Sequence, residues 1–413
     1  MKNHSIGVKL LWSLEVKMKT LSIFILVLAM ASFVFAAGNT ATVDQDGDNH
    51  DGTITQTGSD NTGEIQQSGN GHTGTISTSG NTNDALIEQL GPSGPRKATI
   101  TQIGDNNIAE TKQNYGGAGG SNQTATQYQE GNLNQAYISS SKLSNASQSQ
   151  VGNENYAIIT QGAYNTASQT QQGHNNHAEI TQSTAGWAHS NDAAQSQTGD
   201  QNEAYIDQNG KDNAADMNQN GDFNIANQNQ TGDENTVSAI QEGNSNNSSQ
   251  TQGSILELST IKQVGDNNQA TTTQSGDKNK IAGSNDWHTY DNGVLLEHVP
   301  EDKGIYQEGD DNIATISQVS THWNYGHQAA ARQFGDGNTM TIDQSGEAST
   351  TGYARQDGNS NTGSIIQDGK ASKSWLFQGG DLNSATISQT GDNHFAEVYQ
   401  SGGSNTATVT QNP

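Results

Sequence analysis

The sequence predicts an all-β fold, a two-sheet β-solenoid of about fifteen stacked 22-residue rungs. Each rung consists of a strand, an arc and a second strand, so that half a rung corresponds to 11 residues. Three observations predict this fold: a repeat of that length, an alternation of period two within it, and a hydrophobic content of only 29 %. A typical globular chain holds roughly 45–50 % apolar residues. A thin column between two sheets needs only one or two apolar residues per strand, so this composition is sufficient.

The repeat is anchored on glutamine and reads Gln-x-Gly-x-x-Asn-x-Ala-x-x-x-Gln. Glutamines that recur in one register over many repeats cannot result from a glutamine-rich composition alone. They indicate a solenoid in which each unit packs on its neighbours. The longest unbroken series of anchors is Gln197, Gln208, Gln219, Gln230, Gln241, Gln252, Gln263 and Gln274.

Alternation within the unit predicts which residues face the interior. In "NIAETKQ" (residues 107–113), Asn107, Ala109, Thr111 and Gln113 fall on one face of a strand, because successive side chains point to opposite faces. We expect the amides at these inward positions to form ladders along the axis, with the alanines packed between them. Besides the anchor series above, the predicted ladder residues are Asn202, Asn213, Asn224, Asn235, Ala204, Ala215 and Ala226.

The segment after each anchor must be a bend. The next asparagine follows the glutamine by five residues, an odd step that would reverse its face in a straight strand. Glycine and Asp or Asn tolerate the backbone of such a bend. Asp200 and Asp222 are 22 residues apart and would stack at about 5 Å, where like charges repel by roughly 0.8 kcal/mol in water. We therefore expect faster assembly at mildly acidic pH or with divalent cations. The predicted turn glycines are Gly199, Gly210, Gly221, Gly232 and Gly243.

The chain divides into a leader and a repeat region. Residues 1–36 are predicted to be a signal peptide, with Met18 as an alternative start, because lysines precede an apolar run that ends in Val34 and Ala36. Residues 37–44 form a short N-terminal segment, and residues 45–413 form the solenoid. We expect no transmembrane segment in the mature chain. The absence of cysteine excludes disulfides, and a net charge of -26 argues against nucleic acid as a partner.

Insertions are expected near residues 90–97, 114–124, 183–190, 283–304 and 319–327. Three of them carry aromatic and histidine residues, which would suit a glycan-binding or metal-binding loop, or a loop that covers part of a sheet face; we favour the covering loop. His322 and His327 lack a third ligand, so no metal or other cofactor is predicted. No catalytic motif is recognisable, and the chain is not expected to be an enzyme. The candidate binding residues are Trp187, Trp287, His288, Tyr290, His322, Trp323 and Tyr325.

The repeat resembles the curlin repeat of curli-type functional amyloid subunits, from Gln45 to Gln411. The resemblance implies a secreted subunit of an extracellular fibre on the cell surface, in the biofilm matrix, with a role in adhesion. It also implies a nucleator subunit, an outer-membrane export pore and periplasmic chaperones as partners. Independently of the resemblance, open strand edges at both ends of a solenoid are templates for another copy. The sequence therefore predicts head-to-tail assembly into a cross-β fibre.

Two other functions are compatible with a solenoid. One is a monomeric adhesin that binds glycans through the aromatic loops. The other is an ice-binding solenoid, suggested by outward Thr-x-Thr pairs; these pairs do not recur on every rung of one sheet, which ranks it below the fibre. The pairs are Thr53 and Thr55, Thr99 and Thr101, Thr271 and Thr273, and Thr408 and Thr410.

Overall fold

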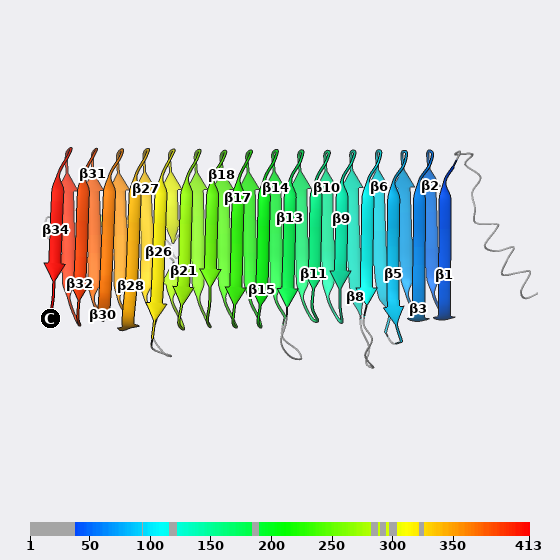
Figure 1. The fold of residues 1–413 in the computed structure, drawn as a ribbon, viewed down its shortest axis with the longest axis horizontal. Coiled ribbons are helices and arrows are strands. Elements are labelled where there is room, and N and C mark those ends of the chain that lie inside the picture. Colours follow the sequence, from blue (N-terminus) through cyan, green and yellow to red (C-terminus); the bar gives the residue numbers. More distant parts are fainter. Residues whose placement is uncertain are drawn as a thin grey trace, which may run out of the picture.

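The solenoid is a straight column of parallel strands in two facing sheets, which we call sheet A and sheet B (Figure 1). Consecutive strands alternate between the sheets, so the all-β two-sheet solenoid of about 15 turns is confirmed. The described residues contain no helix. The computed structural model describes residues 38–92, 94–114, 122–183, 190–281, 288–289, 295–296, 304–321 and 326–413.

Both sheets have 16 strands. Sheet A contains, in spatial order, β1 (Thr40–Asp48), β3 (Thr62–Asn70), β5 (Asp84–Gly91), β7 (Ile108–Asn114), β9 (Gln135–Ser140), β11 (Tyr156–Gln161), β13 (His177–Ser183), β15 (Glu203–Asn209), β17 (Ile225–Thr231), β19 (Asn247–Gln252), β21 (Gln269–Ser275), β26 (Ile313–Ser320), β28 (Thr339–Ala348), β30 (Thr362–Lys370), β32 (Ser384–Thr390) and β34 (Thr406–Gln411). Sheet B contains β2 (Asp51–Thr57), β4 (Thr73–Ser79), β6 (Arg96–Ile103), β8 (Gln123–Glu130), β10 (Asn145–Val151), β12 (Thr166–Gln172), β14 (Asp192–Thr198), β16 (Ala214–Asn220), β18 (Thr236–Glu242), β20 (Leu258–Val264), β22 (Lys280–Ile281), β25 (Ile305–Glu308), β27 (Gln328–Phe334), β29 (Thr351–Asp357), β31 (Lys373–Gly379) and β33 (Phe395–Ser401). The short strands β23 (His288–Thr289) and β24 (Leu295–Leu296) pair with each other.

The register of the strands follows the repeat. Gln45 pairs with Gln67, which lies one 22-residue rung further along the chain. Insertions do not disturb this register, because Gln263 pairs with Gln307 across a gap of 44 residues. The anchor glutamine, and not the loop length, therefore sets how each rung lies on the previous one.

Insertions occur at two places in the rung. Four of the expected insertions lie in turns that lead from a sheet A strand to the following sheet B strand, which we call the A-to-B edge. The fifth interrupts a strand: β22 and β25 pair with the same neighbours, β20 and β27, on either side of residues 282–303. On the opposite B-to-A edge, the described turns are short throughout. The two edges of the column are thus different surfaces.

The core consists of the inward residues of both sheets. Ala178 and Ile180 on β13 have no exposed surface, whereas their neighbours on the strand point outward. The buried apolar residues fall into three separate clusters along the column. Polar inward residues separate these clusters.

Most of the described turns use two left-handed residues, a glycine and a second residue two or three places later. Gly221 has a φ of 127°, and Phe223, two residues later, has a φ of 58°. A Cβ on Gly221 would lie 2.1 Å from the carbonyl oxygen of Gly243 in the next rung, so only glycine fits there. The five turn glycines all have positive φ. The second left-handed position, however, accepts residue types that rarely adopt this backbone, such as Phe223 and Leu256. Backbone hydrogen bonds to the neighbouring rung hold it, for example from Phe223 N to Asp200 O at 3.0 Å.

Candidate functional site: side-chain ladders and outer faces

Glutamine ladders run through the core along both sheets. The Nε2 of Gln197 donates to the Oε1 of Gln219 at 2.9 Å, and Gln208 donates in the same way to Gln230 at 2.8 Å. The Nε2 of Gln219 also donates to the carbonyl oxygen of Glu203, at 2.9 Å on the facing sheet. One amide thus joins successive rungs and also joins the two sheets. The anchor series alternates between the sheets, with Gln197, Gln219, Gln241 and Gln263 in sheet B and Gln208, Gln230, Gln252 and Gln274 in sheet A.

A second glutamine ladder occupies the inward position two places before the anchor. The structure places these additional residues at Gln127, Gln148, Gln169 and Gln195 of sheet B, and at Gln228 and Gln250 of sheet A. The consensus repeat leaves this position undefined, and sequence reasoning missed the ladder. The Gln-x-Gln spacing in "NASQSQV" puts both amides on one face and was the signal that could have revealed it.

Asparagine ladders line the two edges of the core. The backbone N of Asn202 donates to the Oδ1 of Asn176 at 3.0 Å, and its Nδ2 donates to the carbonyl oxygen of Gly221 at 2.7 Å. Asn224 lies on this B-to-A edge, while Asn213 and Asn235 lie on the A-to-B edge. The side chain therefore ties each turn to both neighbouring rungs. Ala204, Ala215 and Ala226 are buried beside these ladders.

Titratable residues replace asparagine at several rungs of the A-to-B edge, and Glu257, His327 and His72 are the most informative of them. Glu257 is 1 % exposed, accepts the backbone N–H of Ser254 at 3.1 Å, and has a pKa that burial raises from 4.5 to about 7. His327 is buried beside the Thr350 hydroxyl, 2.6 Å from its Nδ1, and burial lowers its pKa. His72 has a pKa lowered by burial and by the Arg96 guanidinium, 3.0 Å from its Nε2.

The aspartates three places after the sheet B anchors form a row on the B-to-A edge. The carboxylate of Asp222 accepts the backbone N–H of Asp200 at 2.8 Å, and the carboxylate of Asp200 accepts that of His174 at 2.8 Å. Asn244 takes the same role one rung further on, accepting from Asp222 at 2.8 Å. The position therefore requires an acceptor for a backbone N–H and does not require a charge. Carboxylates follow one another directly at Asp266, Asp310 and Asp336.

The aromatic loop residues take no place in the described architecture. Trp187, Trp287, Tyr290, His322, Trp323 and Tyr325 lie outside the described residues, and only the backbone of His288 is described. His327 faces the interior as a ladder residue. Within the described ranges, no group of three His, Cys, Asp or Glu could hold a metal ion. None of the described segments is a helix long and apolar enough to cross a membrane.

An aromatic and arginine cluster covers the outer face of sheet B near β27 to β33. Arg355 donates from Nε to both carboxylate oxygens of Asp357, at 2.9 and 3.0 Å, and its guanidinium lies 5.1 Å from the ring centre of Phe334. Phe377 and Tyr399 stack with their ring centres 5.0 Å apart. Sequence reasoning missed this cluster, although "KSWLFQG" shows aromatic residues at alternate positions of one repeat.

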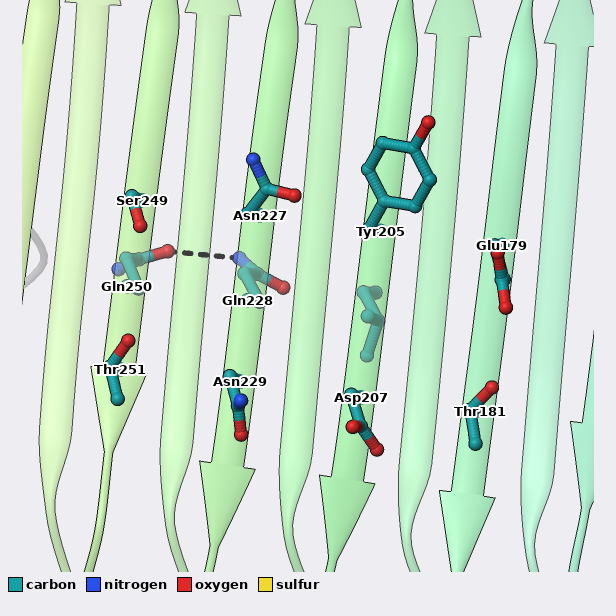
Figure 2. A pocket seen from close by; sticks show the side chains of 11 residues that line it. Glu179, Thr181, Tyr205, Asp207, Asn227, Gln228, Asn229, Ser249, Gln250 and Thr251 are labelled. Atoms are coloured by element: carbon teal, nitrogen blue, oxygen red, sulfur yellow. Dashed lines mark hydrogen bonds between the residues drawn. The ribbon is translucent and has the colours of Figure 1, made fainter.

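The outer face of sheet A changes character along the column. Figure 2 shows the change in a shallow depression, where Glu179, Tyr205 and Asp207 give way to Asn227 and then to smaller hydroxyl residues. The outward charged residues from β1 to β15 are Asp44, Asp46, Glu64, Asp84, Glu88, Glu110, Glu179, Glu203 and Asp207, with Lys112. On sheet B from β20 to β33 they are Lys262, Lys280, Arg332, Arg355 and Lys373, with Glu308, Asp357 and Glu397.

Comparison with known families identifies the repeat. The family model described as the curlin associated repeat matches residues 36–62, 58–91, 188–221 and 377–412. These segments span strands from both sheets and from both ends of the column. No curated protein sequence matches the chain.

Proposed function

Because the chain is a curlin-repeat protein, we propose that it is the structural subunit of a curli-type extracellular fibre, in which copies add head to tail. The observation that carries the proposal is the ladder system, which keeps one register along the column. An added copy can therefore continue the same glutamine and asparagine hydrogen bonds and the same buried alanine column. Stacked identical amides of this kind are the interaction that stabilises cross-β fibres.

The end strands supply the surfaces for this addition. Among the described strands, β1 pairs only with β3, and β34 pairs only with β32. Val43 on β1 faces inward and pairs with the buried Ile65, yet it is 44 % exposed. Burying a valine fully stabilises by roughly 1.5–3 kcal/mol, and the edge of β1 also offers backbone groups to a new strand. Addition of a copy is therefore favoured by both packing and hydrogen bonding.

The proposal includes location and partners. The signal peptide predicted at residues 1–36 would direct export, and the fibre would lie on the cell surface and contribute to matrix and adhesion. A nucleator subunit, an outer-membrane pore and periplasmic chaperones would be the partners, by resemblance to curli-type subunits. The ladder and turn residues would act as the structural determinants of the fibre, and the aromatic loops as its variable surface.

Seeded assembly tests the proposal. The purified chain is diluted from denaturant and its thioflavin fluorescence is followed with and without preformed seeds. We expect the Val43→Asp variant to elongate poorly, because it places a charge on the inward face of an end strand. The matched control is Thr40→Asp, which adds the same charge to the outward face of that strand, beside Thr62, and is expected to elongate like the wild type. Equal elongation of both variants, or a wild-type chain that stays monomeric, contradicts head-to-tail addition.

A further inference from the structure

We propose that two outer faces of the solenoid dock onto each other between copies, so that filaments associate laterally. Both faces consist of the outward residues on either side of the buried residue two places before the anchor glutamine. Panel B comprises these residues on β2 to β14 of sheet B, and panel A comprises them on β19 to β34 of sheet A. The inference goes beyond head-to-tail growth, which uses strand edges and not sheet faces.

Both panels are rows of small hydroxyl side chains. In panel B the residues are threonine or serine except Tyr128 and Ala194, and in panel A except Asp343 and Ile366. The Thr-x-Thr pairs of the sequence belong to these rows, with Thr99 on β6 of panel B. Strict threonine pairs are scattered over the two sheets, but serine keeps a hydroxyl group at most of the other rungs. The rows are thus more continuous than the threonine pairs alone indicate.

Charge favours a second copy as the occupant of these panels. The chain has a net charge of -26, yet panel B contains no charged residue and panel A contains only Asp343. A pair of opposed carboxylates about 4 Å apart would cost roughly 1 kcal/mol in water and more near protein. The panels are therefore the parts of the two sheet faces where copies can approach closely without bringing carboxylates together.

The remaining halves of the two faces favour the same pairing. When panel A of one filament lies on panel B of another, the acidic half of sheet A can lie opposite the half of sheet B that carries Arg332, Arg355 and Lys373. Pairing sheet A with sheet A in parallel would instead oppose its carboxylates. Opposite charges across an interface select the partner and its orientation. We therefore assign the contact to sheet A on sheet B.

The shape of the sheets is suited to face-to-face packing. The strands of both sheets stay nearly parallel along the whole column (Figure 1). Such flat sheets are unusual and are typically stabilised by side-chain ladders or by stacking on another sheet. Threonine and serine are short enough for two sheets to interdigitate at about 10 Å. The two panels can therefore make contact along their whole length.

The contact area is adequate for repeated association. Seven strands of either panel cover about 29 Å along the axis, and two outward residues per strand cover about 13 Å along the strands, or about 400 Å² on each copy. A stable interface buries about 800 Å² per partner, so one pair of panels alone would bind weakly. In a filament the panels recur in every subunit, and linked contacts strengthen one another. Lateral association should therefore follow filament formation.

Charge insertion into panel B tests the inference. The Thr99→Asp and Ser168→Asp double variant adds two carboxylates to the panel. The matched control is the Thr40→Asp and Thr160→Asp double variant, which adds two carboxylates to the acidic half of sheet A at positions that pair with no carboxylate. Seeded elongation is measured by thioflavin fluorescence, and lateral pairing by electron microscopy and low-speed pelleting. We expect all three proteins to elongate alike, the wild type and the control to form paired filaments, and the panel variant to form single filaments. Paired filaments of the panel variant, or single filaments of the wild type, overturn the inference.

The outcomes separate this inference from the fibre proposal. If no protein elongates, head-to-tail growth fails, and sedimentation of the same soluble proteins then tests the panels. A wild-type dimer that the panel variant loses supports the docking surface, and a wild-type monomer overturns it. The wild type could instead show thermal hysteresis and no lateral pairing, with the hysteresis lost in the panel variant. That result would assign the panels to ice binding and would also overturn the docking inference.

Discussion

Substitution of Glu257 by asparagine should stabilise the solenoid above neutral pH. Glu257 stands where neighbouring rungs carry Asn235 and Asn279, and its carboxylate is buried between them. Burial raises its pKa from 4.5 to about 7, with a smaller contribution from Asp277, while hydrogen bonds from Ser254 N and Asn279 oppose the rise. The Glu257→Asn variant removes the buried charge and restores the amide ladder.

The magnitude follows from this pKa rise. The folded state holds the proton more tightly than the unfolded state, so the free energy of unfolding falls as pH rises from 4.5 to about 7 and is level above that. One pKa unit corresponds to about 1.4 kcal/mol, so the loss is on the order of 3 kcal/mol at pH 8. At pH 5 most of this loss is absent. The variant should therefore exceed the wild type by up to about 3 kcal/mol at pH 8 and by much less at pH 5.

Hydrogen exchange measures this difference locally. Peptides from β18 to β21 of both proteins are compared at the same pH by mass spectrometry, which cancels the intrinsic pH dependence of exchange. We expect faster exchange of the wild type at pH 8 and closely similar exchange at pH 5. Identical wild-type and variant exchange at both pH values would refute the reasoning, because the buried carboxylate would then carry no ionisation cost.

Three further predictions concern the ladders and turns. Gly221→Ala should prevent folding or assembly, because its Cβ would lie 2.1 Å from the carbonyl oxygen of Gly243. Gly71→Asn should be tolerated, because no atom lies within 4 Å of the added Cβ. Circular dichroism and seeded growth compare the two variants. Gln219→Leu should lower the free energy of unfolding by about 3 kcal/mol or more, because Gln197, Gln241 and the carbonyl of Glu203 each lose a buried partner. Urea unfolding measures this change, and a loss below about 1 kcal/mol would contradict the prediction. Asp310→Asn should shorten the assembly lag at neutral pH and not at acidic pH, because it removes one of three stacked carboxylates and keeps a side-chain oxygen that accepts the backbone N–H of Asp266. Equal lag times of the variant and the wild type at neutral pH would count against charge repulsion.

The sequence predicted the architecture because the 11-residue repeat places the same residue types on the inward face of successive strands. Asn, Ala and Gln recur on the inward face of each 11-residue unit, and the structure buries Asn202, Ala204 and Gln208 together. The second ladder at Gln127 and Gln148 was missed because the consensus leaves that position undefined. Their position an even number of residues from the anchor glutamine, on the same face of the strand, would alone have assigned these residues to the core.

Other features depend on contacts that one repeat does not contain. Phe223 adopts a left-handed backbone because hydrogen bonds to the adjacent rung outweigh its own preference, so residue propensity could not reveal it. The interruption between Ile281 and Ile305 could be recognised as an insertion, but the neighbours β20 and β27 were needed to place it within a strand. The ring stack of Phe377 on Tyr399 likewise depends on the register of two strands 22 residues apart.

X-ray diffraction from aligned fibres of the chain tests the central claim most directly. If copies continue the solenoid head to tail, the strands lie across the fibre axis and the sheets face each other. The account predicts a meridional reflection near 4.7–4.8 Å and an equatorial reflection near 10 Å from seeded fibres. A soluble β-rich monomer, or an ordered aggregate without the meridional reflection, would contradict it.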